Sequence, residues 1–205
     1  MPPPHWDGDS PTLRQNLERV LRRIGVEAAA RAPLKLATIQ SWHREMMADL
    51  DMEGLPPNAA GGFRGEAGLN YDVHVGGLSG VSVSQVTAAL AEFEVKLVAR
   101  VAKLDAAIAA GALPTDQQIE DILETCGWAH AEWVRIHPFC NGNGRTARLL
   151  TNAIAQRYRL PVFVRLRPRP EGNDYAAAGA AAMRGDWAPT VSVLRRYLNK
   201  KIGRP

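Results

Sequence analysis

The sequence predicts an all-α domain with one small β-hairpin inserted between its helices. Along most of the chain, apolar residues recur at steps of three and four, which is the spacing of one face of a helix. Alanine, the strongest helix former, is abundant, and only 6% of the residues are aromatic. A single glycine-rich stretch, residues 54–80, interrupts this helical pattern.

Two helices are predicted before the glycine-rich stretch, at residues 12–32 and 34–50. Ser10 followed by Pro11 is a typical helix start, because proline fits the first helical position without losing a hydrogen bond. Pro33 ends the first pattern, since proline cannot continue a helix interior.

The predicted hairpin lies within the glycine-rich stretch. Strict alternation of apolar and polar residues there is typical of a short, half-buried strand. The alternating residues are Tyr71, Asp72, Val73, His74 and Val75.

Five further helices are predicted after the hairpin, at residues 84–110, 115–136, 143–159, 173–184 and 187–200. Thr115 with Gln118 three residues later forms a capping-box pattern. Pro138 places the end of the fourth helix near His137. Residues 161–172, which are rich in proline and arginine, are expected to be extended.

Composition and charge exclude several classes of protein. The net charge of +4 and pI of about 9.3 permit contact with phosphates, but pI alone is weak support for nucleic-acid binding. The two cysteines lack the spacing of a zinc site, which predicts a reduced, cytoplasmic setting. No signal peptide and no membrane-spanning stretch are expected.

The segment 136–148, Ile-His-Pro-Phe-Cys-Asn-Gly-Asn-Gly-Arg-Thr-Ala-Arg, combines features of a phosphate site. Gly142 and Gly144 allow unusual backbone conformations, so together with Asn143 they can aim several N–H groups into one concave nest. The segment leads into a helix N-terminus, which favours anions. Arg145 and Arg148 lie one turn apart on that helix, and arginine matches phosphate oxygens well.

His137 immediately precedes this phosphate site. A neutral imidazole can take up a proton near pH 7, and transfer of a phosphate group to a hydroxyl requires such a base. Phe139 is expected to pack inward and anchor the loop, and His130 is interpreted as a packing or hydrogen-bonding residue. His43 belongs to no recognisable constellation. The arginines at 165, 167 and 169 are interpreted as a polar surface strip or as a contact for an acidic partner.

This segment resembles the signature of the Fic domain, His-Pro-Phe-x-(Asp/Glu)-Gly-Asn-Gly-Arg-x-x-Arg. Gly62-Phe63-Arg64 followed by residues 73–77 resembles the flap of that family, and Gly185-Asp186 resembles a pair near its C-terminal end. The resemblance implies a Fic-type helical bundle over residues 35–205, preceded by an extension helix within 1–34. Eight signature positions match: His137, Pro138, Phe139, Gly142, Asn143, Gly144, Arg145 and Arg148.

The resemblance implies transfer of AMP from ATP to a Tyr, Thr or Ser hydroxyl of a target protein. His137 would be the base that deprotonates the hydroxyl, and pyrophosphate would leave. The phosphates would be held by the N–H groups of Gly142, Asn143 and Gly144 and by the side chains of Arg145 and Arg148. The hairpin from Tyr71 to Val75 would hold the target segment as an added strand.

Position 141 departs from the signature, because Asn141 stands where the family usually has an Asp or Glu that holds Mg²⁺. Hard cations prefer carboxylates. Three interpretations are open: Asn141 ligates Mg²⁺ weakly, the metal is held by nucleotide and water alone, or the site uses another donor or reacts slowly. The first, catalysis with weakened Mg²⁺ binding, is favoured.

No segment matches the family's inhibitory pattern, (Ser/Thr)-x-x-x-Glu-(Gly/Asn). Ser41 and Glu45 have the right spacing, but Met46 follows them. The resemblance therefore implies either a separate protein that supplies the glutamate, as an antitoxin does for a toxin, or no inhibitor at all.

Two other functions are compatible with the sequence. One is a degenerate Fic domain that binds nucleotide or a partner without turnover, which only Asn141 supports. The other is a Fic enzyme that uses UTP, GTP, phosphocholine or the γ-phosphoryl group as its donor.

Overall fold

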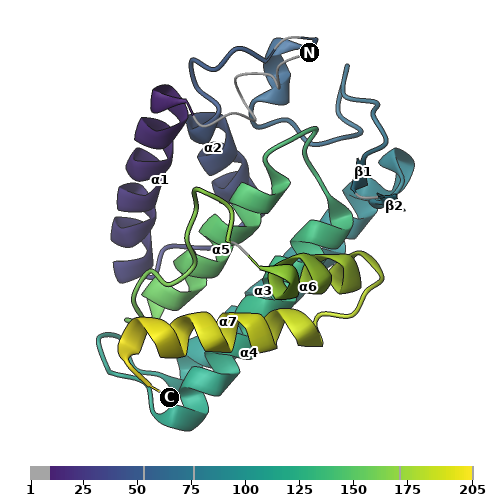
Figure 1. Ribbon diagram of the computed structural model, residues 1–205. Coiled ribbons are helices and arrows are strands. Elements are labelled where there is room, and N and C mark those ends of the chain that lie inside the picture. Colours follow the sequence, from purple (N-terminus) through teal and green to yellow (C-terminus); the bar gives the residue numbers. More distant parts are fainter. Residues whose placement is uncertain (1–9, 53, 76, 171, 205) are drawn as a thin grey trace.

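The computed structural model describes residues 10–52, 54–75, 77–170 and 172–204, and it confirms the predicted all-α class (Figure 1). A two-stranded antiparallel sheet is inserted between the second and third helices. The helices within the described residues are α1 (Pro11–Ala29), α2 (Leu36–Met46), α3 (Val86–Ala107), α4 (Asp116–Ile136), α5 (Asn143–Arg157), α6 (Asn173–Met183) and α7 (Ala188–Ile202).

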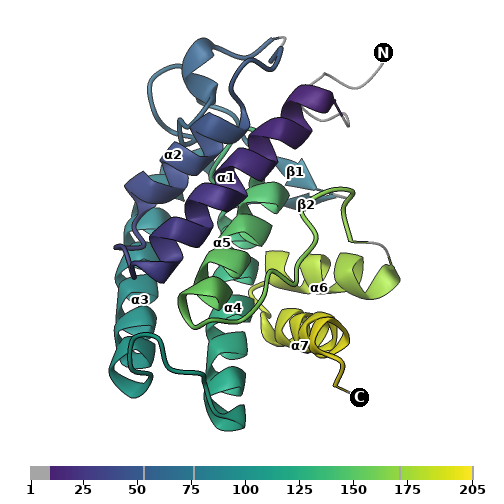
Figure 2. The same ribbon diagram turned by 90° about the vertical axis from the view of Figure 1, so that its left-hand side faces the viewer.

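Helix α4 lies at the centre of the bundle and packs against α3, α5, α6 and α7 (Figure 2). Its N-terminus carries the predicted capping box between Thr115 and Gln118. Gly127 in its middle has a packing reason, since a Cβ there would lie 2.4 Å from a methyl carbon of Val191. The close approach of α7 to α4 therefore depends on glycine at this position.

Helix α1 is fixed to the rest of the protein by its apolar face. Ser10 caps it, accepting a 3.1 Å hydrogen bond from the backbone N–H of Leu13. Leu17, Val20 and Ile24 join the same hydrophobic core as the helices that follow. The division between an extension at 1–34 and a domain at 35–205 stays a prediction; residues 1–9 and 205 lie outside the described part of the chain.

The hairpin is shorter than the alternating pattern predicts. Among the described residues, only β1 (His74–Val75) and β2 (Leu78–Ser79) form strands, with His74 opposite Ser79 and Val75 opposite Leu78. Gly76, between them, lies outside the described residues.

Tyr71, Asp72 and Val73, which were predicted as strand, precede β1. Tyr71 and Asp72 bond to groups outside the hairpin: the Tyr71 carbonyl oxygen accepts from Arg64, and the Asp72 carboxylate accepts from the backbone N–H of Val83. These bonds hold the base of the hairpin as an irregular segment.

Within the described residues, none of the helices combines the length and apolar character needed to cross a membrane.

Candidate active site

The loop between α4 and α5 turns sharply at both of its ends. His137 caps α4 in the left-handed conformation, with φ of 54°. Gly142 precedes α5 with φ of 77°, and a Cβ there would lie 2.9 Å from Nε2 of His43. Position 142 therefore requires glycine both for its backbone conformation and for the close approach of His43.

The side chain of Asn143 holds this loop closed. Its Oδ1 accepts from the backbone N–H of Phe139 at 2.9 Å, and its Nδ2 donates to the Phe139 carbonyl oxygen at 2.8 Å. Phe139 is fully buried, as predicted. The side chain of Asn143 therefore fixes the shape of the loop, and its backbone N–H lies at the N-terminus of α5.

His43 supports the loop from below, a role that the sequence did not indicate. Its ring stacks on Phe139 with centroids 3.7 Å apart. The backbone N–H of Gly61 donates to Nδ1, so Nε2 carries the proton and donates to the Asn141 carbonyl oxygen at 3.0 Å. Burial lowers the pKa of His43 to about 3, which keeps the ring neutral in this arrangement.

Arg64 supports the loop from the other side and is fully buried. Its guanidinium donates to the carbonyl oxygens of His137 at 2.7 Å and Ile136 at 2.9 Å. It also donates to the carbonyl oxygens of Tyr71 and Val81, which belong to the two ends of the hairpin segment. The resemblance placed Arg64 near the flap, but the sequence contained no signal for these long-range bonds.

His137 has the geometry of a base. Its Nδ1 lies 2.9 Å from the Val134 carbonyl oxygen, which can only accept, so Nδ1 carries the proton and Nε2 keeps its lone pair. Burial lowers the pKa of His137; the bond to Val134 opposes this effect and the positive charge of Arg64 adds to it. The ring is therefore neutral and able to accept a proton near pH 7.

A cavity of about 760 Å³ opens beside His137, a size typical of small-molecule sites. The loop, α5, α6, the hairpin and the segment after α5 all contribute to its wall. Tyr71 and Asp72 are not among the described residues that line it. The predicted site residues that do are His137, Asn141, Gly142, Asn143, Gly144, Arg145, Arg148, Val73, His74 and Val75.

Arg145 and Arg148 are buried in the cavity wall, each only 4% exposed. Arg145 donates from Nη2 to Oδ1 of Asn141 at 3.1 Å. Arg148 donates from Nη2 to the Leu166 carbonyl oxygen at 3.0 Å, while its buried Nε has no hydrogen-bond partner. An unpaired buried donor is costly, and a ligand oxygen would satisfy it.

A buried polar chain positions Arg148. Its Nη1 lies 3.4 Å from the hydroxyl oxygen of Tyr175, and that hydroxyl lies 3.1 Å from Nε2 of His130. The other ring nitrogen of His130 lies 3.0 Å from the hydroxyl oxygen of Thr151, which donates to the Ala147 carbonyl oxygen and so accepts from His130. Burial lowers the pKa of His130 to about 3. His130 is therefore a neutral hydrogen-bonding residue, as predicted.

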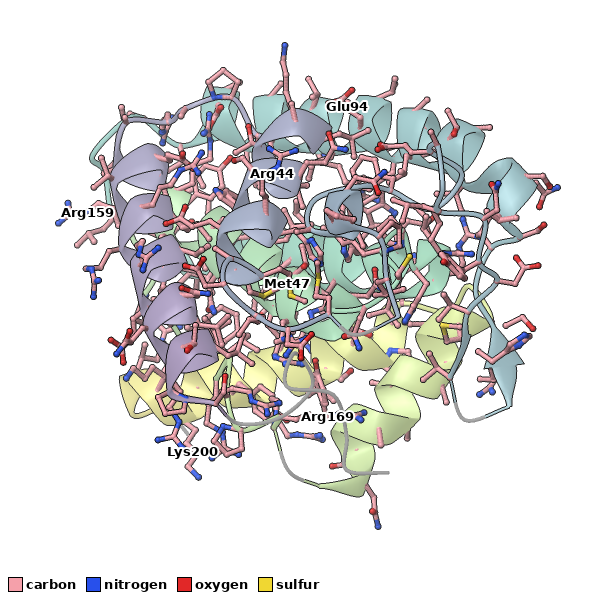
Figure 3. The ribbon with its side chains drawn as sticks, turned by 90° about the horizontal axis from the view of Figure 1, so that it is seen from above. Arg44, Met47, Glu94, Arg159, Arg169 and Lys200 are labelled. Atoms are coloured by element: carbon pink, nitrogen blue, oxygen red, sulfur yellow. The ribbon has the colours of Figure 1, made fainter. Side chains whose placement is uncertain are left out.

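Of the three following arginines, interpreted as a polar surface strip, Arg165 and Arg169 are exposed as expected, whereas Arg167 is partly buried. Arg167 and Arg169 line the cavity, and the Arg169 guanidinium lies 5.6 Å from the centre of the Tyr175 ring. Figure 3 shows Arg169 beside α6, on the opposite side of the molecule from Glu94. The reason is that Asn152 of α5 bonds the backbone of Val164 and draws this segment across the cavity.

The residues present do not fit a protein-held Mg²⁺. Oδ1 of Asn141 already accepts from the Gly142 N–H and from Arg145. No Asp or Glu is found among the described residues that line the cavity. Because Mg²⁺ is bound through carboxylates and water, a single amide oxygen shared with a guanidinium is a poor ligand. The role of Asn141 as a metal ligand stays a prediction that this geometry does not support.

The chain belongs to the Fic/DOC family, whose sequence model matches residues 33–155. It is 38% identical over 91 residues to the protein adenylyltransferase Fic of Nematostella vectensis. That match covers 44% of this chain and 21% of the relative. The chain thus spans about a fifth of the length of the curated relative.

Solved structures show the same fold. Fic-1 (residues 134–508) from Caenorhabditis elegans superimposes with a TM-score of 0.62 at 22% identity, covering 96% of this chain and 54% of that chain. The BepC protein of Bartonella tribocorum with bound AMPPNP gives a TM-score of 0.59 at 16% identity, covering 90% and 85%. The predicted Fic-type helical bundle is therefore confirmed.

Proposed function

We propose that this protein is an adenylyltransferase that moves AMP from ATP to a Tyr, Thr or Ser hydroxyl of a target protein. The observation that carries the proposal is the position of His137, which keeps an Nε2 lone pair and lines a cavity together with the N-terminus of α5 and two buried arginines. The names of the relatives similar in sequence support the same activity.

The proposed reaction uses this chain's residues in two ways. His137 takes the proton from the target hydroxyl, whose oxygen attacks the α-phosphorus of ATP. The bond from the α-phosphorus to the bridging oxygen breaks, and pyrophosphate leaves with that electron pair. The N–H groups of Gly142, Asn143 and Gly144 hold the phosphates, while Arg145 and Arg148 stabilise the developing charge.

The hairpin is the proposed docking site for the target. Val73, His74 and Val75 line the cavity, and Val75 is 43% exposed beside it. A two-stranded sheet has open edges to which an extended peptide can add. The test is Val75→Asp, which is expected to lower labelling of the target and leave the affinity for ATP unchanged. Equal labelling of the target by both forms would contradict this role.

Control by a separate inhibitory protein that supplies a glutamate is also proposed. Glu45, which belongs to the internal segment most similar to the inhibitory pattern, forms an ion pair with Arg23 at 3.2 Å. A cytoplasmic location is proposed because Cys126 and Cys140 are both free thiols.

The deciding experiment compares ATP labelled at the α- or the γ-phosphate, with the protein alone and in a cell lysate, alongside His137→Ala. Protein labelling from the α position only, lost in the variant, is the expected result. Labelling from the γ position would show phosphorylation instead. Tight ATP binding without any labelling would favour a domain that binds nucleotide without turnover. That outcome is included because Oδ1 of Asn141 accepts from Arg145, at the position where the family usually has a carboxylate.

A further inference from the structure

We infer that the cavity neutralises the phosphates of its nucleotide with four arginines and therefore binds ATP without a divalent cation. The inference rests on the proposed function, because it concerns the same cavity. It adds Arg167 and Arg169 to the residues that bind the nucleotide. It also makes the side chain of Asn141 a hydrogen-bond partner of Arg145 instead of a metal ligand.

The first support is the position of the Asn141 side chain. Its Oδ1 accepts from Nη2 of Arg145 at 3.1 Å and from the N–H of Gly142. Both partners are donors that favour an oxygen at this point. A cation at this oxygen would have to displace Arg145 and remain beside its positive charge, which is unfavourable in a largely buried site.

The second support is the balance of charge around the cavity. Arg145 and Arg148 line it from α5, and Arg167 and Arg169 line it from the segment between α5 and α6. No Asp or Glu is among the described residues that line the cavity. A triphosphate carries several negative charges, and guanidinium groups bind its oxygens through paired, charge-assisted hydrogen bonds.

The third support is that the segment carrying the additional arginines is fixed to α5. Nη2 of Arg148 donates to the Leu166 carbonyl oxygen, and Nδ2 of Asn152 donates to that of Val164 at 2.8 Å. Arg165 braces the same segment by donating to the carbonyl oxygens of Pro168 and Arg169, both at 3.1 Å. The backbone that carries Arg167 and Arg169 is thus held beside the cavity before any ligand arrives.

The experiment is titration of the full chain with ATP by calorimetry, once with excess Mg²⁺ and once with EDTA. The expected dissociation constants differ by less than threefold. A dissociation constant at least threefold weaker in EDTA would overturn the inference while leaving the proposed function intact. Failure to bind ATP under either condition would instead refute the proposed function, and the inference with it.

Two variants test the individual parts in EDTA, after thermal melting shows that each is folded. Arg167→Ala is expected to weaken ATP binding about tenfold, as the loss of a charge-assisted hydrogen bond does. Arg22→Ala removes the same charge from an exposed part of α1 outside the cavity and is the matched control. Equal affinity of these two variants would exclude Arg167 from the site.

Asn141→Asp is the complementary variant. The new carboxylate would repel the phosphates in EDTA and provide a ligand for Mg²⁺, so ATP affinity should become at least tenfold stronger with Mg²⁺ than in EDTA. If this variant responds to Mg²⁺ no more than the natural chain does, the assignment of Asn141 is wrong.

Discussion

Arg64 holds His137 by its backbone: Nε of Arg64 donates to the His137 carbonyl oxygen at 2.7 Å, from a side chain that has no exposed surface. His137 is in the left-handed conformation, which costs about 1 kcal/mol or more for a residue other than glycine. The bond to Arg64 helps to offset that cost. The same guanidinium also bonds the hairpin segment. His137, the proposed proton acceptor, and the proposed docking site are therefore supported by one side chain.

Replacing Arg64 by lysine is expected to lower the free energy of unfolding by about 3 kcal/mol or more, because several buried carbonyl oxygens lose their donors. Transfer activity should also fall at a temperature at which the variant is still folded. Urea unfolding and α-phosphate labelling measure the two effects. Arg22→Lys is the control, and an unfolding free energy within 1 kcal/mol of the natural chain would contradict this role.

The transfer activity should fall as the pH is lowered, with a midpoint below the ordinary pKa of histidine. Only the neutral form of His137 can act as a base, and its pKa is lowered by burial and by Arg64. His137 is therefore half protonated at a pH below the ordinary value of about 6.5. A profile of kcat/KM against pH is expected to have its acidic midpoint below that value, whereas a midpoint above it would show that another group controls the reaction.

Gly80→Ala should slow the reaction without changing the binding of the nucleotide. A Cβ on Gly80 would lie 2.9 Å from the Cβ of His137, so the imidazole must shift. A small displacement of a catalytic group lowers the reaction rate about tenfold or more. The variant should therefore have a lower kcat and an unchanged affinity for ATP. Gly25→Ala in α1, which meets only the end of the Gln156 side chain at 3.3 Å, is the matched control. Equal kcat for both variants would disprove the contact's importance.

Tyr175→Phe should weaken ATP binding through Arg148. The variant removes the hydroxyl between Arg148 and His130, so the guanidinium loses one restraint and the acceptor nitrogen of His130 loses its donor. We expect affinity for ATP to fall about threefold to tenfold, with about 1 kcal/mol of lost stability. Tyr197→Phe, whose ring centre lies 6.4 Å from that of Tyr175, is the control. An ATP affinity that matches this control would limit Tyr175 to packing.

The sequence was informative where the site is built from one continuous segment. The loop from His137 to Arg148 is such a segment, and its prediction needed only glycine conformations, a helix start and arginine chemistry. His43 and Arg64 could not be found in this way. Each acts through contacts with residues 70 or more positions away, and such contacts leave no local pattern.

The hairpin and the arginine segment show a second limit. Tyr71 and Asp72 have the alternation of a strand, but their bonding partners are Arg64 and Val83, so tertiary contacts override the local preference. Arg167 and Arg169 were expected on the surface because arginine usually lies there, and the sequence does not show that they line the cavity. The bonds from Asn152 and Arg148 to their segment, which link residues far apart in the sequence, hold it beside the cavity.

The bonds of Arg64 also divide the hairpin into two parts that are held by different contacts, because β2 packs against α6. Tyr71 and Val81, at its base, are tied to the loop through one guanidinium, whereas the strand residues at its tip do not share that support. Substitutions in the two strands should therefore disturb the position of His137 less than substitutions that break the bonds of Arg64. Evolution or design could direct the proposed transfer to another target by changing the strands while the contacts of Arg64 are kept.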